Sequence, residues 1–185
     1  IMIKAYGTGL KSTIQGWTDE ISYLYANGDR VFRQKLDYGK ASGTGNAPRL
    51  DGMVTANQWK HYGAEPERAY NYTYNIPKRL TGSVYRQKSG SSWSTNNFYT
   101  ENNIAYGANG NIETLTRYRE KAGAAAQIDH LAYTYNGNQL TGVGDAAPTA
   151  HKADGFHDGN SSGADYAYNG NGYLKEDKNK GIASI

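Results

Sequence analysis

The chain has 185 residues, a usual length for one domain, and a formal net charge of +3 at pH 7. It contains no cysteine, which excludes disulfides, and no run approaches the ~18 apolar residues of a membrane-spanning helix, so no membrane-spanning segment is expected. The densest charged run, 175–180, carries both signs, which argues against nucleic-acid binding. With 17 tyrosines, 23 glycines and few aliphatic residues, the composition is typical of an all-β fold with many tight turns.

The N-terminal part of the chain predicts two or three strands. The segment 1–6 is expected to be extended, and Gly7–Gly9 is expected to interrupt it. A tight turn at Gln15-Gly16 should then join a strand over 10–14 to a strand over 17–21.

The next predicted turn is Asn27-Gly28-Asp29, and the strand after it spans 31–38, where apolar and polar side chains alternate. A loop of small residues is expected over 40–49. A helix is the alternative for 17–25, because two adjacent acidic residues there suit the first turn of a helix.

Residues 50–63 predict a strand that pairs with 69–74 across a turn at 64–68. Three further stretches are expected to be loops: 86–98, 119–127 and the polar, glycine-rich stretch 145–163. The alanine-rich part of the second loop, 122–126, would also suit a short helical turn.

The segment 131–144 is the clearest hairpin in the sequence. Leu131, Tyr133 and Tyr135 alternate with polar or small residues, as in a strand with one apolar face. Asn136-Gly137 then predicts a type I′ turn, in which both central residues need a positive φ, and the chain returns through 139–143.

The same pattern occurs four times. The other copies span 70–82, 103–112 and 165–174, and the last tyrosines of the four incoming strands are Tyr74, Tyr106, Tyr135 and Tyr168. The intervals between these tyrosines are 32, 29 and 33 residues, and such regular spacing indicates a repeat architecture. A single hairpin cannot bury its apolar face, so neighbouring hairpins are expected to stack beside one another.

These copies resemble the RHS/YD repeat, whose core is Tyr-Asp-x-x-Gly-Arg-Leu. The residues that carry the resemblance are Tyr74, Asn75, Arg79 and Leu80; Tyr106, Asn109 and Gly110; Tyr135, Asn136, Gly137 and Leu140; and Tyr168, Asn169, Gly170 and Leu174. The segment 14–17, Ile-Gln-Gly-Trp, also resembles the Ile-Arg-Gly-Trp form of bacterial members.

The copies depart from the core at two positions. Asparagine or Gly107 replaces the core aspartate, and the core arginine remains only at Arg79. If the aspartate accepts a structural hydrogen bond, asparagine keeps that acceptor oxygen and loses only the charge.

The resemblance implies an all-β fold of antiparallel hairpins in a continuous, twisted, spiral sheet, of which this piece would hold about ten to fourteen strands. Periodicity alone would equally allow an open sheet, a closed sheet or a β-solenoid. Residues 1–185 are expected to form a single RHS/YD-repeat region and to be a piece of a much longer chain. The repeats would lie near 10–40, 50–87, 98–119, 128–144 and 164–185.

The resemblance also implies a structural function in a large secreted or cell-surface bacterial protein. The sheet would form a shell that encapsulates or presents a C-terminal, toxin-like domain, as in polymorphic toxins, and it would use neither catalytic residues nor a cofactor. The expected partners are other repeats of the same chain, an enclosed C-terminal domain, and export machinery or surface proteins. The alternative is a binding module that recognises glycan or protein partners through exposed tyrosines.

Three groups of polar residues are candidates for chemical sites. The loop 151–158 gathers two histidines and two carboxylates, which suit a metal, but no rigid element fixes their spacing, so a solvated loop is favoured. His61 and His130 stand alone on predicted strands. The carboxylate pairs 19/20, 65/67 and 176/177 do not predict a hydrolase, because adjacent residues of a strand point to opposite faces.

Overall fold

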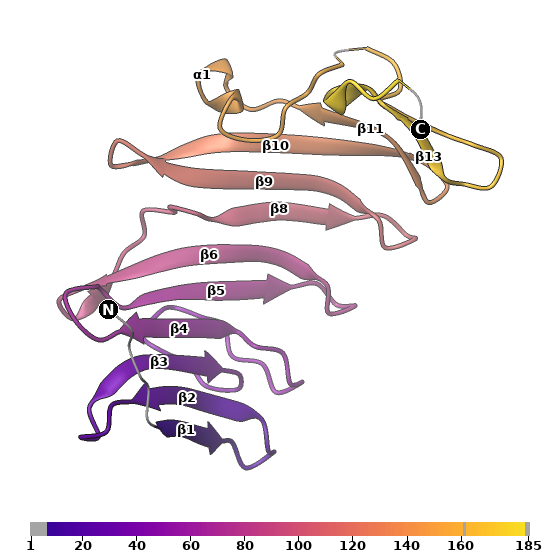
Figure 1. The fold of residues 1–185 in the computed structure, drawn as a ribbon. Helices are drawn as coiled ribbons and strands as arrows, with labels where there is room; N and C mark the ends of the chain where they lie inside the picture. Colours follow the sequence, from indigo (N-terminus) through magenta and orange to yellow (C-terminus); the bar gives the residue numbers. More distant parts are fainter. Residues whose placement is uncertain (1–6, 161, 184–185) are drawn as a thin grey trace. The chain divides into compact units, whose positions relative to one another are not determined.

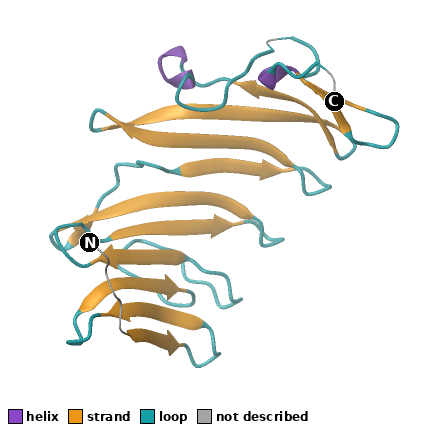
Figure 2. Cartoon of the chain, in the orientation of Figure 1, coloured by secondary structure: helices purple, strands orange, loops and turns teal. Residues whose placement is uncertain are grey.

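The computed structural model describes residues 7–160 and 162–183, so the extended segment predicted over 1–6 lies outside the described residues. The described part is all-β, with 13 strands that pair antiparallel, one single-turn α-helix and one 3₁₀ turn (Figures 1 and 2). The predicted all-β class with antiparallel strands is confirmed, and so is the predicted number of ten to fourteen strands. The chain divides after Asn97 into two compact units.

The first unit is an antiparallel meander in which each strand pairs with the next one along the chain. Its strands are β1 (Gly7–Ser12), β2 (Thr18–Leu24), β3 (Arg30–Asp37), β4 (Ala56–His61), β5 (Arg68–Tyr74), β6 (Leu80–Ser89) and the short β7 (Ser92–Trp93), which folds back on β6. In the described pairings of this unit, β1 and β6 are not neighbours, so the meander is open.

The second unit is a shorter meander followed by a small separate hairpin. The meander contains β8 (Glu101–Tyr106), β9 (Ile112–Lys121), β10 (Ala124–Asn136) and β11 (Gln139–Asp145). The one-turn helix α1 (Thr149–Lys152) follows, and then β12 (Tyr166–Tyr168), β13 (Leu174–Asp177) and the 3₁₀ turn η1 (Lys178–Lys180).

One face of the first sheet is aromatic, because its strands alternate with a period of two. The ring centroids of Trp59 and Tyr70 lie 5.7 Å apart, and Tyr85 meets Tyr70 edge-on at 5.6 Å. Phe32 contacts His61 across the neighbouring strand pair at 4.9 Å. Such pairs contribute about 0.5–1.5 kcal/mol each beyond the area they bury.

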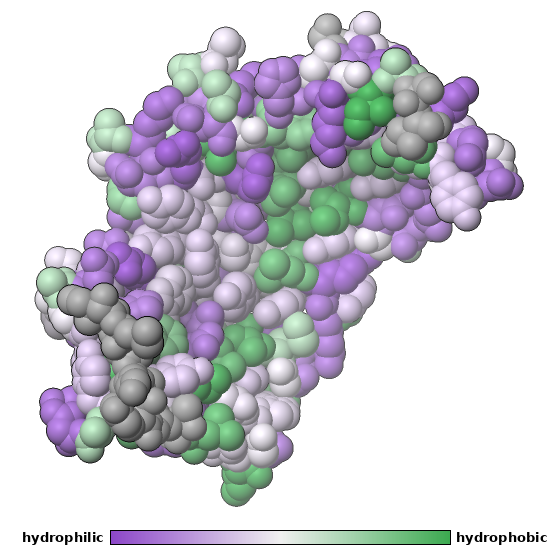
Figure 3. Space-filling view, in the orientation of Figure 1, coloured by the Kyte–Doolittle hydropathy of each residue, from purple (hydrophilic) through white to green (hydrophobic). Residues whose placement is uncertain are grey.

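The opposite face carries charges that pair across the strands. Glu20 of β2 is 3.2 Å from Lys11 of β1, and Glu67 contacts Arg33 of β3 and lies 3.1 Å from Lys88 of β6. Burial alone would raise the pKa of Glu20, but the hydrogen bond and the charge of Lys11 leave it below its usual value. Figure 3 shows hydrophobic, pale and hydrophilic residues side by side on the surface it draws.

A fully buried carboxylate holds the long loop of the second unit against the sheet. Asp129 of β10 is 0% exposed; it accepts a hydrogen bond from Nε of Arg117 at 2.7 Å and another from the backbone N–H of Phe156 at 2.5 Å. The loop 145–163 is therefore held on β10 by the Asp129 carboxylate, which forms an ion pair with Arg117 of the sheet and a hydrogen bond with Phe156 of the loop.

Several predicted boundaries were wrong. Gly7–Gly9 does not interrupt a strand but pairs with β2 inside β1, and the strand predicted over 50–63 begins only at Ala56. The alternative helix over 17–25 does not form, because β2 occupies that stretch. The loop predicted over 86–98 begins inside β6 and contains β7.

The prediction of a loop over 119–127 was also wrong, because β9 and β10 join there through a two-residue turn. Its central residues are Ala122 and Gly123, with φ of 51° and 81°, which is the pattern of a type I′ turn. The predicted loop 145–163 contains the short helix α1.

The fourth hairpin, β12–β13, forms a two-stranded sheet of its own instead of extending the meander of the second unit. The reason lies at Asp165. Its backbone N–H bonds to the carbonyl of Thr141 at 2.8 Å, and its carboxylate accepts the N–H of Val143 at 2.7 Å. The Asp165 carboxylate thus takes the N–H of Val143, which would otherwise bond to a backbone carbonyl of a strand paired with β11.

We expect Asp129→Ala to lower the free energy of unfolding by about 3 kcal/mol, because it leaves Arg117 and the Phe156 N–H without their buried partner. The matched control is Asp154→Ala. Asp154 lies on the same loop and pairs with Arg119 and Lys121 at the surface, where solvent screens the charges, so its loss should cost clearly less than that of Asp129. Urea unfolding monitored by circular dichroism measures both values, and equal losses would contradict the assignment.

Candidate functional site

The residues of the repeat motif occupy the same register in all four hairpins. Each motif tyrosine lies opposite the motif aliphatic residue: Tyr74 opposite Leu80, Tyr106 opposite Ile112, Tyr135 opposite Leu140, and Tyr168 opposite Leu174. A register shift falls directly before every one of these tyrosines, as in a β-bulge. The motif residues of one copy are thus brought together, whereas the copies lie on separate hairpins.

Three of the four copies share one turn. The N–H groups of Asn75, Gly107 and Asn169 each bond to the carbonyl of the residue four positions later at 2.9–3.0 Å. The residue three positions after each of these has a left-handed backbone, with φ of 65° at Lys78, 86° at Gly110 and 81° at Gly172. This is a three-residue hairpin loop that closes on a left-handed residue, where glycine is favoured. The glycine of the RHS/YD core stands at this position.

In two of these three copies the asparagine that replaces the core aspartate closes the turn with its side-chain oxygen. Oδ1 of Asn75 accepts the N–H of Arg79 at 2.9 Å, and Oδ1 of Asn169 accepts the N–H groups of Asn171 and Tyr173 at 3.0 and 3.1 Å. An uncharged carboxamide is sufficient for this bond, because the donors are neutral backbone groups.

The copy around Tyr135 is one residue shorter and turns differently. Asn136 pairs with Gln139, so the central residues of the turn are Gly137 and Asn138. Of the two, only Gly137 has a positive φ, 61°, which matches a type II′ turn. The predicted type I′ turn at Asn136-Gly137 was therefore wrong, because the strand continues one residue further than predicted.

A tyrosine hydroxyl ties each of three motif copies to an earlier part of the chain. Tyr74 donates to the carbonyl of Val54 at 2.7 Å, Tyr135 to Ile112 at 2.8 Å, and Tyr168 to Leu140 at 2.9 Å. Tyr38, outside the four copies, donates to Thr18 in the same way at 2.9 Å. We call Tyr38, Tyr74, Tyr135 and Tyr168 the anchor tyrosines. Burial raises the pKa of the first three of them.

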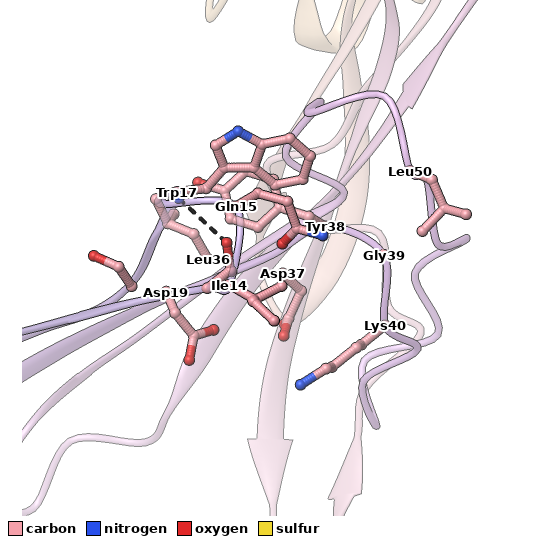
Figure 4. A pocket seen from close by; sticks show the side chains of 12 residues that line it. Ile14, Gln15, Trp17, Asp19, Leu36, Asp37, Tyr38, Gly39, Lys40 and Leu50 are labelled. Carbon is pink, nitrogen blue, oxygen red and sulfur yellow. Dashed lines mark hydrogen bonds between the residues drawn. The ribbon is translucent and has the colours of Figure 1, made fainter.

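A groove of about 670 Å³ opens beside the first anchor tyrosine (Figure 4). We call it the turn groove; its lining comes from the turn after β1, the end of β3 and Leu50. The rings of Trp17 and Tyr38 lie 5.1 Å apart on one side, and the side chains of Asp19 and Lys40 lie on the other. Its volume falls in the range of ligand pockets, and it combines aromatic rings with a few charged groups.

The rim of the turn groove is apolar and exposed. Ile14 is 98% exposed and Leu50 is 86% exposed, although both are large hydrophobic residues. A smaller cavity of about 150 Å³ recurs beside Tyr135, between the turn at 107–111 and Gly137. The space between the turn of one hairpin and the anchor tyrosine of the next is therefore a repeated feature of this fold.

The predicted carboxylate pairs do not form a common site. Glu20 faces the charged side of the first sheet, whereas Asp19 lines the turn groove, as expected for neighbours in a strand. Glu65 is 2.6 Å from Arg68 at the surface, whereas Glu67 is buried against lysine and arginine. Each of these pairs is thus split between two environments.

The histidine-containing loop is held by cations. Asp154 lies 2.9 Å from Nζ of Lys121 and 3.1 Å from Arg119, and the Lys121 hydrogen bond lowers the pKa of Asp154. Over residues 7–160 and 162–183, no three histidine or acidic side chains come together in a way that could hold a metal ion.

Sequence reasoning missed the turn groove, because Trp17, Tyr38 and Leu50 are far apart in the chain.

Among the described residues, no helix has the length and apolar character needed to cross a membrane. Comparison with protein-family models and with curated proteins found no match to this chain.

Lys78→Gly should stabilise the protein by about 0.5–1 kcal/mol, because glycine removes the strain of a left-handed lysine and only a weak surface ion pair is lost. Gly110→Lys at the equivalent turn position should destabilise by a similar amount. Thermal unfolding measures the stability change of both variants. A loss of stability in Lys78→Gly would refute the equivalence of the two turns.

Stability should fall as the pH rises above about 10, the usual pKa of tyrosine. Burial raises the pKa of Tyr38, Tyr74 and Tyr135 in the folded state, so the unfolded chain loses these protons first and is favoured at high pH. Chemical denaturation at pH 8 and pH 10.5 measures the loss. Replacing all three with phenylalanine should flatten this dependence, and an unchanged slope would contradict the assignment.

Proposed function

We propose that the chain is a structural segment of an RHS/YD-type repeat sheet, whose hairpins are stabilised by their neighbours in a longer protein. The observation that carries this proposal is the bond from an anchor tyrosine hydroxyl to an earlier carbonyl. A two-stranded hairpin alone is at best marginally stable in water. A bond that reaches a different hairpin adds stability only when that neighbour is folded.

The way the first sheet buries its residues supports the same role. Few large apolar side chains are fully buried in it, and Ala56, Ala69 and Tyr85 are its buried hydrophobic residues within the described part. Stability must therefore come largely from pairing along the sheet: ring contacts on one face and ion pairs on the other. Such a sheet is suited to be extended hairpin by hairpin.

In this role the repeat sheet encapsulates or presents a C-terminal, toxin-like domain of a secreted or cell-surface bacterial protein. Its action is steric, because a continuous sheet keeps proteases away from the enclosed segment, and the side chains perform no chemistry. The partners are further repeats of the same chain and the enclosed domain.

The hydroxyl bonds can be tested one at a time. Tyr74→Phe, Tyr135→Phe and Tyr168→Phe each leave a backbone carbonyl without its donor and should lower the free energy of unfolding by about 1 kcal/mol. Tyr173→Phe is the control, because Tyr173 is 69% exposed and should change stability by less than about 0.5 kcal/mol. If the three anchor variants behave like the control, the structural role of the motif tyrosine is wrong.

The shell itself is tested in the complete gene product that contains this chain. Limited proteolysis should leave the repeat region and the enclosed C-terminal segment intact. The variant in which Tyr74, Tyr135 and Tyr168 are all replaced by phenylalanine should expose that segment to cleavage. Rapid cleavage of the C-terminal segment in the unmodified protein would reject enclosure while leaving the stability result untouched.

A binding module is the second candidate, and the turn groove favours it. Trp17 and Tyr38 offer ring faces next to Asp19, the combination that a sugar ring or a peptide side chain requires. Tryptophan fluorescence with chitotriose as the probe tests the glycan reading. Binding should be lost in Trp17→Phe and kept in Trp93→Phe, whose tryptophan does not line the groove.

A further inference from the structure

The sequence contains the dipeptide Asn-Gly five times, at 27–28, 109–110, 136–137, 169–170 and 171–172. In this dipeptide the backbone nitrogen of glycine can attack the side-chain carbonyl carbon of asparagine and expel ammonia. The five-membered succinimide that forms is opened by water to aspartate or isoaspartate. The net reaction converts an amide and water into an acid and ammonia, so it needs no reactant other than water.

In three of the five dipeptides, a hydrogen bond in the turn holds the glycine N–H whose nitrogen would attack. The N–H of Gly28 bonds to the carbonyl of Tyr25 at 3.0 Å, that of Gly110 to Gly107 at 3.0 Å, and that of Gly172 to Asn169 at 2.9 Å. Each attack must first break that bond and disturb the left-handed turn that it closes. These three sites are therefore protected by the fold.

The fourth site is protected at the other reacting group. Among the described hydrogen bonds, none is donated by the N–H of Gly170. However, the side chain of Asn169 is held, because its Oδ1 accepts the N–H groups of Asn171 and Tyr173. The carboxamide would have to leave both donors to turn its carbon toward the Gly170 nitrogen.

At Asn136-Gly137 the described hydrogen bonds restrain neither reacting group. The Asn136 side chain is exposed and makes none of these bonds. None of them is donated by the Gly137 N–H either, in a turn that is closed by the Asn136–Gln139 pair. We infer that Asn136 is a site of spontaneous deamidation in the folded protein, selected from five identical dipeptides by the different turn of its hairpin.

The modification would alter a structurally important turn. Isoaspartate inserts one extra main-chain carbon between residues 136 and 137, and the two-residue turn has no room for it without loss of the Asn136–Gln139 pair. Tyr135, the anchor tyrosine that bonds to Ile112, is the adjacent residue. The isoaspartate product therefore loosens the anchor of this hairpin, whereas the aspartate product restores the residue type of the repeat core.

The test compares the five sites within one molecule. The folded chain is incubated at pH 9, and peptide mapping by mass spectrometry follows conversion at each asparagine. Because one hydrogen bond of ordinary strength changes a population roughly tenfold, Asn136 should be modified at least about tenfold faster than the other four. The same chain in concentrated urea should be modified at all five sites at similar rates.

Two results would overturn the inference. One is conversion in the folded chain at Asn27, Asn109, Asn169 or Asn171 that is as fast as at Asn136. The other is a preference for Asn136 that persists in urea, because the cause would then be the local sequence and not the turn. Asn136→Gln should abolish the fast conversion and leave the rates at the other four sites unchanged.

Discussion

The bond from a tyrosine hydroxyl to a backbone carbonyl earlier in the chain is the interaction on which the rest of this structure depends. It occurs at Tyr38, Tyr74, Tyr135 and Tyr168 with oxygen distances of 2.7–2.9 Å. Tyrosine suits the position because the ring covers apolar surface and the hydroxyl satisfies a carbonyl outside the strand ladder. Phenylalanine would bury as much area but would leave that carbonyl without a donor.

This interaction explains why a chain so rich in tyrosine and so poor in aliphatic residues folds at all. Over residues 7–97 the first unit contains strands and loops but no helix, so many side chains find their partners within the sheet itself. On one face the partners are aromatic rings, and on the other they are opposite charges such as Glu67 with Arg33 and Lys88. Both kinds of contact run across the strands and join each strand to the next.

The sequence predicted those features whose chemistry is local. Asn75, Gly110 and Gly172 mark turns because asparagine bonds to its own loop and glycine adopts a left-handed backbone, and the hairpins lie where these residues stand. The turn at Ala122-Gly123 was missed because alanine rarely adopts a positive φ, so nothing in the sequence signals it. The turn groove was missed because Trp17 and Tyr38, 21 positions apart, meet only after β2 and β3 have paired.

The anchor bonds also determine how far a disturbance can travel. The bonded residues are separated by 20 to 28 positions, so each anchor reaches an adjacent hairpin or strand and nothing more distant. Because each anchor bond joins only neighbouring parts of the chain, a whole hairpin can be added or deleted without changes to the other hairpins. Evolution can therefore lengthen such a protein by duplication of one hairpin, provided that the new copy keeps its tyrosine and the carbonyl that receives it.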